Sequence, residues 1–221
     1  METTNKYKLS NIAIEFNGVT LHRIKALKDF SDVKAGDLGG WIEKEDNLSQ
    51  IDDAWVYSNA KVYGNAKVFG NAQVFGKAKV HDNAVVCDDA WVYDNAEVYG
   101  RARVFGNATV YLNAKVYDHA EVYGHAMVFV KAKICGNANV CGYAEICGDT
   151  VVKNNEDYIV FKNFWSSGRH FTWTKPNNMW KVGCFYGTGE ELIKKAYIDG
   201  KKSGKEYERV VRYVNSILAD E

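Results

Sequence analysis

The sequence predicts a mainly β protein: a β-helix of about five to six coils, a β-hairpin cap before it and a small α+β module after it. The centre is a six-residue repeat that begins at Ala54 and runs through sixteen consecutive units without an insertion, as in AWVYSN, AKVYGN and AKVFGN. Slot one is always Ala, and slot three is always Val or Ile, until Thr150. A period of six does not fit an α-helix, whereas inward Ala and Val alternating with a variable residue is typical of a strand.

The last slots of each unit predict the corners of the coil. Slot five is usually Gly or Asp and slot six is most often Asn, and these residue types adopt positive φ at low cost. Three strands and three corners would close one triangular coil, and successive coils would stack about 4.8 Å apart. The pattern resembles the bacterial hexapeptide-repeat superfamily, which implies a left-handed β-helix. The next unit, TVVKNN, lacks the aromatic residue of slot four and is expected to mark the end.

Residues one coil apart are expected to share a face of the rod. One face carries Trp55, Trp91 and Met127 in slot two, and exposed aromatic patches usually mark contacts. We therefore expect a homo-oligomer, a dimer or trimer, through this face, unless the C-terminal segment covers it. A second face is either a solvated charge ladder or a surface that attracts an anion. Its slot-two residues, interrupted by Glu97, are Lys61, Lys79, Lys115 and Lys133.

Slot four holds Tyr, Phe, His or Cys in nearly every unit. These side chains are expected to stack on the coil below and shield the corners. The alternative is a platform on which bases or sugars stack, but such platforms usually lie in a basic groove, and the sequence shows none. We therefore expect a structural role.

Two non-repetitive segments flank the β-helix of residues 48–155. Residues 1–47 predict a hairpin around the Asn17-Gly18 turn, followed by a cap with Trp41 and Ile42 as the plug of the first coil. Residues 156–221 predict a β-meander and two helices. The first helix should begin with a capping box at Thr188 and Glu191, and the two helices should be separated near Gly200 to Gly204.

Several stretches resemble hexapeptide-repeat proteins of phages and prophages. The N-terminal stretches are LHRIKALKDF and GDLGGWIE, and the C-terminal stretch is GCFYGT. The resemblance covers almost the whole chain and implies a phage or prophage accessory protein.

Composition narrows the function classes. The 28 Lys and Arg residues balance the 28 Asp and Glu residues, which argues against a protein that coats nucleic acid. The apolar stretches are far shorter than the about 20 residues of a membrane helix, and no secretory signal opens the chain. Five cysteines with no pairing geometry in the rod indicate a reducing compartment, so we expect a cytoplasmic protein.

An acyltransferase is the main alternative, because the superfamily's best-known members are acyltransferases. The resemblance to them implies a trimer, a His base near a subunit boundary and loops inserted into the rod. Here His119 and His125 occupy neighbouring corners, too far apart to cooperate, and the repeat has no insertion. Cys135, Cys141 and Cys147 point to different corners, so no metal site is expected. Cys184 is expected to be a small buried residue.

The C-terminal module offers the best candidate for a functional surface. Cationic, hydroxyl and aromatic residues lie close together in its sequence, a set that suits a phosphate-bearing or nucleotide ligand or a protein contact. The alternative is a hairpin whose alternate residues are core and surface. The candidate residues are Arg169, His170, Thr172, Trp173, Trp180 and Lys181.

The sequence thus predicts a non-enzymatic accessory protein without a cofactor. It would use the β-helix to bind a host component, either a protein effector or a nucleotide signal, and so inhibit a bacterial defence system. The expected inhibition of a defence system is an analogy at the level of the family. A structural protein of the virion is the second alternative.

Overall fold

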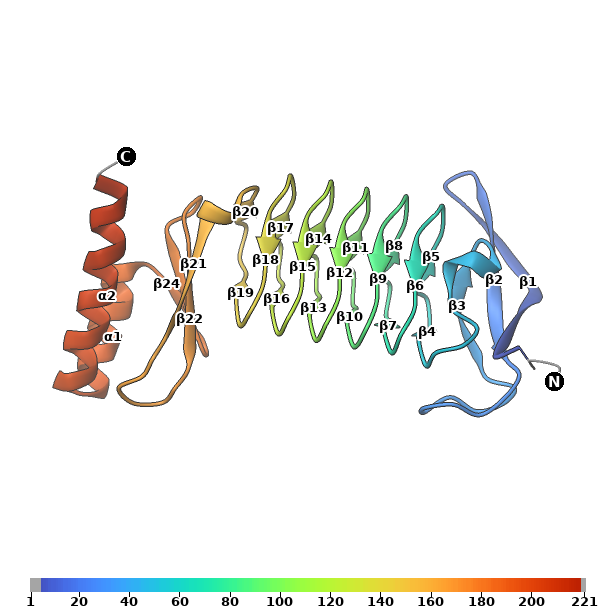
Figure 1. Ribbon diagram of the computed structural model, residues 1–221, viewed down its shortest axis with the longest axis horizontal. Coiled ribbons are helices and arrows are strands. Elements are labelled where there is room, and N and C mark those ends of the chain that lie inside the picture. The colour runs from blue at the N-terminus through green and yellow to red at the C-terminus, as the bar shows by residue number, and fades with distance from the viewer. Residues whose placement is uncertain (1–4, 220–221) are drawn as a thin grey trace.

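The computed structural model describes residues 5–219 and shows an elongated molecule with three parts in a row (Figure 1). A β-rich cap lies at one end, a stack of coils forms the middle, and a four-stranded sheet backed by two helices lies at the other end. The predicted mainly β fold with a central β-helix is confirmed.

The cap is built on the predicted hairpin. β1 (Tyr7–Phe16) and β2 (Val19–Ala26) pair antiparallel. Asn17 and Gly18 form the turn with φ of 51° and 81°, the pair of positive values that a two-residue hairpin turn requires. β3 (Leu38–Ile42) pairs antiparallel with β2 and parallel with a strand of the rod, so the cap continues directly into one side of the β-helix.

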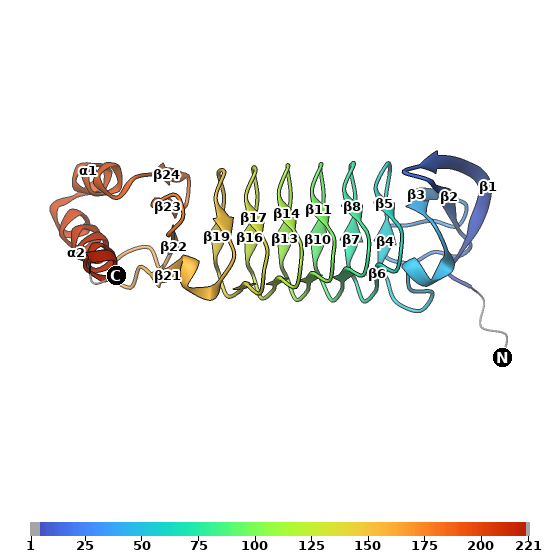
Figure 2. The ribbon, with the colours of Figure 1, turned by 90° about the horizontal axis from the view of Figure 1, so that it is seen from above.

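Three parallel sheets form the sides of the rod, and neighbouring strands within each sheet are one coil apart (Figure 2). The lysine face follows β3 and consists of β5 (Lys61–Val62), β8 (Lys79–Val80), β11 (Glu97–Val98), β14 (Lys115–Val116), β17 (Lys133–Ile134) and β20 (Val151–Val152). The tryptophan face consists of β4 (Trp55–Val56), β7 (Gln73–Val74), β10 (Trp91–Val92), β13 (Thr109–Val110), β16 (Met127–Val128) and β19 (Glu145–Ile146). The third face consists of β6 (Lys67–Val68), β9 (Val85–Val86), β12 (Arg103–Val104), β15 (Glu121–Val122) and β18 (Asn139–Val140).

Alanine and β-branched residues fill the interior of the rod as predicted. The Ala of slot one and the Val or Ile of slot three are buried in every coil. The unit that begins at Thr150 adds β20; buried Thr150 precedes this strand in place of the Ala, and Val152 points inward. Short 3-10 helices flank the coils at η1 (Glu45–Asn47) and η2 (Asn155–Asp157).

Aromatic side chains of slot four stack along the corners, as predicted. Along one corner the ring centroids of Phe75 and Tyr93 are 4.6 Å apart, those of Tyr93 and Tyr111 are 5.0 Å apart, and those of Tyr111 and Phe129 are 4.9 Å apart. The rings are within 11° of parallel. Their spacing is that of the coils, so backbone pairing and ring stacking support each other.

The plug of the first coil is Ile42 and not Trp41. Ile42 pairs with Val62 and points into the core, whereas Trp41 pairs with Lys61 on the outside. The prediction for Trp41 was wrong because neighbouring residues of a strand face opposite sides. The Arg23 guanidinium lies over one face of the Trp41 ring, 4.9 Å from its centroid.

The C-terminal sheet lies between the end of the rod and the helices (Figure 1). Its antiparallel strands run in chain order. They are β21 (Tyr158–Lys162), β22 (His170–Thr174), β23 (Met179–Val182) and β24 (Phe185–Gly187). The face away from the rod packs on α1 (Gly189–Asp199) and α2 (Lys201–Ala219) and forms a second core.

Helix α1 begins with the predicted capping box. The Thr188 hydroxyl accepts a hydrogen bond from the Glu191 N–H, and the Glu191 carboxylate accepts one from the Thr188 N–H. Gly200, with φ of 148°, separates the helices. We had predicted that the break extends to Gly204, but Gly204 belongs to α2. A Cβ atom at this position would lie 2.4 Å from the Tyr197 ring. The small size of Gly204 lets the two helices pack closely.

Candidate interaction surface

The residues of the C-terminal set do not converge on one site. Trp173 and Trp180 are buried in the second core, and the Trp173 indole N–H donates to Asn178. Thr172 is buried on the opposite side, where its hydroxyl oxygen accepts a 2.9 Å hydrogen bond from the Glu145 N–H. The prediction that these three residues bind a ligand is wrong, because strand alternation directs them to two separate packed faces.

The other members of the set join the module to the rod or lie at its edge. The His170 ring stacks on Tyr143, with centroids 4.4 Å apart. The Lys181 ammonium lies 3.3 Å from the Glu145 carboxylate and 5.7 Å from the Phe129 centroid. Arg169 lines a cavity of about 120 Å³ between the sheet and the helices. His170 and Lys181 are thus already engaged by the rod.

The histidines proposed for an acyltransferase lie at corners, as predicted. The His125 ring stacks on Tyr143, with centroids 4.9 Å apart, and so continues the column that ends at His170. The His119 N–H donates to the Gly136 carbonyl of the next coil. His125 is therefore part of the stacking that holds the coils together.

The five cysteines are free. Burial raises the pKa of Cys87 and of Cys147 to about 11, so these thiols stay protonated at neutral pH and are poor nucleophiles. Cys184 is exposed and not buried as predicted, because it follows Gly183 in the turn between β23 and β24.

No three His, Cys, Asp or Glu side chains within residues 5–219 form a group that could hold a metal ion. Neither described helix is long and apolar enough to cross a membrane.

The tryptophan face is open only in its middle. Trp55, predicted to be part of an oligomer contact, is 2% exposed, because the rings of Tyr7 and Phe30 pack edge-on against it at 6.0 and 5.2 Å. The cap therefore covers the position that we had assigned to a partner. Trp91 is 46% exposed, and Met127, two coils further on, is half-buried.

The corner beside this open stretch carries two unexpected apolar residues. Leu112 and Val130 occupy slot five, where the other fourteen Ala-containing units have Gly, Asp or Ser. Their φ values are 59° and 66°, a left-handed conformation that costs a non-glycine residue about 1–2 kcal/mol and is rarer still for a β-branched one. Leu112 remains 38% exposed and Val130 37% exposed, so this corner combines backbone strain with an exposed apolar surface.

Elsewhere the same slot makes useful bonds. Asp82, Asp88 and Asp118 each accept a 3.0 Å hydrogen bond from the N–H of the glycine one coil further on. Asp94 accepts one from the Leu112 N–H. Leu112 and Val130 cannot continue this pattern, since neither has a polar side chain.

We refer to Trp91, Leu112, Met127 and Val130 together as the Trp91 patch. The aromatic column of slot four borders it, and Phe75 packs edge-on against Trp91 with centroids 6.1 Å apart. Sequence reasoning found Trp91 and Met127 but missed Leu112 and Val130. The signal was present in the units ATVYLN and AMVFVK, which break the Gly, Asp or Ser rule of slot five.

Part of the rod is similar to known repeats. A family model described as the YdcK beta solenoid repeat matches residues 96–112 and 102–118, which lie in β11 to β14 and their corners. Residues 96–118 are similar to that repeat. The protein named "Uncharacterized acetyltransferase YdcK" from Escherichia coli (strain K12) is 40% identical over 60 residues, 24% of this chain and 18% of that protein. This chain therefore matches less than a fifth of that relative's length.

Proposed function

We propose that this protein is a non-catalytic scaffold that self-associates through the Trp91 patch. The rod would hold the cap and the C-terminal module at a fixed distance and orientation. The observation that carries the proposal is the pair of strained, exposed residues Leu112 and Val130 beside Trp91. Backbone strain clusters at functional positions, and an exposed apolar surface of this kind fits a protein contact.

A second copy of the chain is the partner that we propose. Rods with the same exposed patch can pair around an axis parallel to the stack, which repeats one contact in a closed dimer or trimer. On the phage resemblance alone, we extend the proposal to a host protein or nucleotide as the component that the assembly binds.

Sedimentation velocity with matched variants tests the self-association. Wild type should sediment as a dimer or trimer at tens of micromolar. Leu112→Asp should be a folded monomer, because it places a charge in the patch while aspartate tolerates the positive φ of this corner.

Two controls separate the patch from general effects of charge. Gly106→Asp puts the same side chain at the corresponding corner of the third face, and Val85→Glu puts a charge in slot two of that face. Both should keep the wild-type assembly, whereas Trp91→Glu should lose it. A monomeric wild type, or an assembly that survives Leu112→Asp and Trp91→Glu, would overturn the proposal.

The acyltransferase alternative rests on the name of the YdcK relative. The matched segments belong to the repeat, and the coils between Ala54 and Val152 carry no inserted loop. We expect no consumption of acetyl-coenzyme A above the uncatalysed rate with amine or hydroxyl acceptors. Consumption that His119→Ala or His125→Ala abolishes without unfolding the protein would contradict the scaffold.

A further inference from the structure

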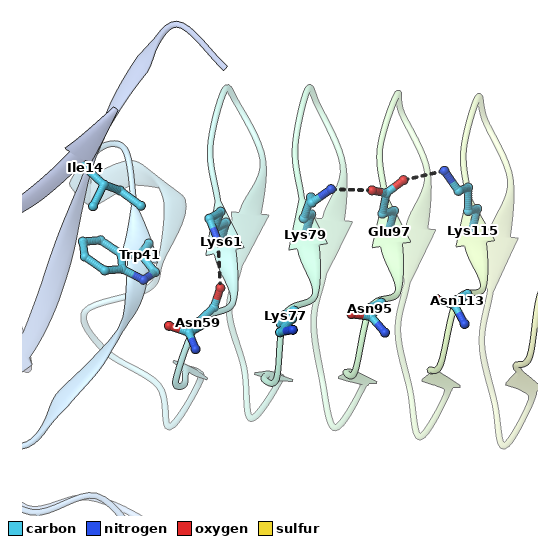
Figure 3. Close-up of a pocket in the computed structure, with 10 residues that line it drawn as sticks. All are labelled: Ile14, Trp41, Asn59, Lys61, Lys77, Lys79, Asn95, Glu97, Asn113 and Lys115. Atoms are coloured by element: carbon cyan, nitrogen blue, oxygen red, sulfur yellow. Dashed lines mark hydrogen bonds and ion pairs between the residues drawn. The ribbon is translucent and has the colours of Figure 1, made fainter. Parts of the chain in front are cut away.

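A groove of about 820 Å³ lies on the lysine face beside the cap (Figure 3). Ile14 of β1 and Trp41 of β3 close one end of it. Two rows of side chains from successive coils line the rest, one from slot two and one from slot six. This volume lies within the about 300–1,000 Å³ of typical small-molecule sites, and its apolar end differs in character from its polar rows.

The groove is cationic although the whole chain has no net charge. Four lysines and one glutamate line it, for a net charge of +3. Glu97 binds two of these lysines, with 2.7 Å between its carboxylate oxygens and the ammonium groups of Lys79 and Lys115. Burial alone would raise the pKa of Glu97, but these two lysines hold it below its usual value. Glu97 is therefore ionised, and each of its two carboxylate oxygens already binds a lysine.

The remaining two lysines, Lys61 and Lys77, have no carboxylate partner among the described residues. The Lys61 ammonium donates to the Asn59 carbonyl at 3.1 Å and lies 4.9 Å from the Phe16 ring. Burial and the nearby charge of Lys79 lower the pKa of Lys61. Lys77 is exposed and points into the groove. Nothing in the described chain neutralises this end, so a bound anion would relieve the repulsion between the lysines.

Asparagine amides extend the row that contains Lys77. Asn95 and Asn113 occupy the same slot on the following coils, and Asn59 occupies it on the preceding one. Their side-chain amides are exposed and make no hydrogen bond within residues 5–219. Each amide offers donors and an acceptor, and coils about 4.8 Å apart repeat them along the groove. The groove therefore offers hydrogen bonds as well as charge.

We infer that this groove binds a small organic phosphate. Its phosphate groups would lie on Lys61, Lys77 and Lys79, and its apolar or ring-bearing part would lie against Ile14 and Trp41. Several separated cations favour a multivalent anion over a single carboxylate. The cationic stretch is confined to a few coils of a neutral chain, which favours a small ligand over a nucleic-acid strand. Leu112 of the Trp91 patch directly precedes Asn113 of the groove, but the lysines and the apolar end that carry this inference lie outside the patch.

Calorimetric titration of the full chain at low salt tests the site, with ATP, inorganic triphosphate and adenosine as probes. ATP should bind, triphosphate should bind more weakly because it lacks the apolar part, and adenosine should not bind measurably. Lys61→Ala and Lys77→Ala should each weaken ATP binding roughly tenfold, a loss of about 1.4 kcal/mol. Glu97→Gln should tighten it, because Lys79 and Lys115 lose their internal partner.

Matched controls come from the same two slots further along the rod. Lys131→Ala and Lys133→Ala remove lysines that do not line the groove and should leave ATP binding unchanged. The inference fails if ATP does not bind at millimolar concentration, or if the control variants weaken binding as much as Lys61→Ala and Lys77→Ala. It also fails if a single-stranded oligonucleotide binds more tightly than ATP, because the groove would then be part of a polymer site.

Discussion

The N-terminal cap shares its hydrophobic core with the rod, whereas the C-terminal module has a core of its own. At the first end, Tyr7, Ile24 and Trp55 belong to the same buried cluster as the inward Val and Ala side chains. At the other end, Phe171 and Trp180 pack with the two helices on the far side of the sheet. One end is thus an extension of the rod, and the other is a unit attached to it.

The junction at the C-terminal end joins apolar packing, in which Tyr158 and Val160 lie against the core of the rod, with polar contacts. The Glu145 N–H donates to Thr172 at 2.9 Å, the Asn139 N–H donates to the Asn155 side chain at 2.8 Å, and the Tyr158 hydroxyl donates to the Asn139 carbonyl at 2.9 Å. The last coil would otherwise expose unpaired backbone groups, which invite edge-to-edge aggregation. Side chains of the module therefore satisfy part of this strand edge.

The largest difference between the two ends should appear in paired aromatic deletions. Trp55→Ala removes a fully packed ring from the shared core and should lower the free energy of unfolding by about 3–5 kcal/mol. Tyr143→Ala removes a ring that is 52% exposed and stacks at the junction, so it should cost about 0.5–1.5 kcal/mol. Urea unfolding of both variants measures the difference. Similar losses would show that the ends are closed in the same way.

A smaller effect is expected from the hydrogen bond that joins module and rod. Thr172→Val keeps the shape of the side chain but leaves the Glu145 N–H without its partner, so it should destabilise the junction by about 1–3 kcal/mol. Hydrogen exchange should quicken at the Glu145 amide while the Trp180 amide stays protected. Loss of protection throughout the β21 to β24 sheet would contradict a local role.

A third effect is a pH dependence at the N-terminal end. Lys6 is fully buried, and its ammonium donates to the carbonyls of Asp52 and Ala54 at 2.5 and 2.8 Å. Burial lowers the pKa of Lys6 to about 8, although Asp52 and Asp53 oppose the shift. Above about pH 8 the folded chain releases a proton that the unfolded chain keeps until about pH 10, so stability contributed by this group rises with pH.

Lys6→Met removes this titration. The difference in free energy of unfolding between wild type and the variant should grow in favour of wild type between about pH 8 and about pH 10. Chemical unfolding of both proteins at several pH values across this range measures the slope. A constant difference would show that Lys6 keeps an ordinary pKa in the folded protein.

The repeat made most of the rod predictable. Ala, Val and the Gly or Asp corner each recur at the same slot, so local preference and packing favour the same structure in every coil. The three faces, the columns of Trp91 and Lys79 and the aromatic stacking followed from counting alone. The sequence also predicted the hairpin at Asn17 and Gly18 and the capping box at Thr188, because each depends on a few neighbouring residues.

Contacts between distant segments were not predictable in the same way. The cap reaches Trp55 through Tyr7 and Phe30, and the module reaches Glu145 through Thr172 and Lys181. Local sequence patterns do not predict contacts between segments that are far apart in the chain. The candidate site in the module failed for this reason, since residues close in sequence were divided between two faces of one sheet. Leu112 and Val130 could be recognised from the sequence, but only as exceptions to the repeat.

Hydrogen exchange on Val92→Asp tests most directly whether rod and module are separate units. The substitution places an unpaired charge in the middle of the closed rod, where Val92 is fully buried, and should unfold the coils around it. We predict that amides of the rod, such as those of Val98 and Val110, lose protection while those of Phe171 and Trp180 keep it. If the module loses protection together with the rod, the two are one cooperative unit and the account is wrong. If the rod keeps its protection, the assignment of Val92 to the interior is wrong as well.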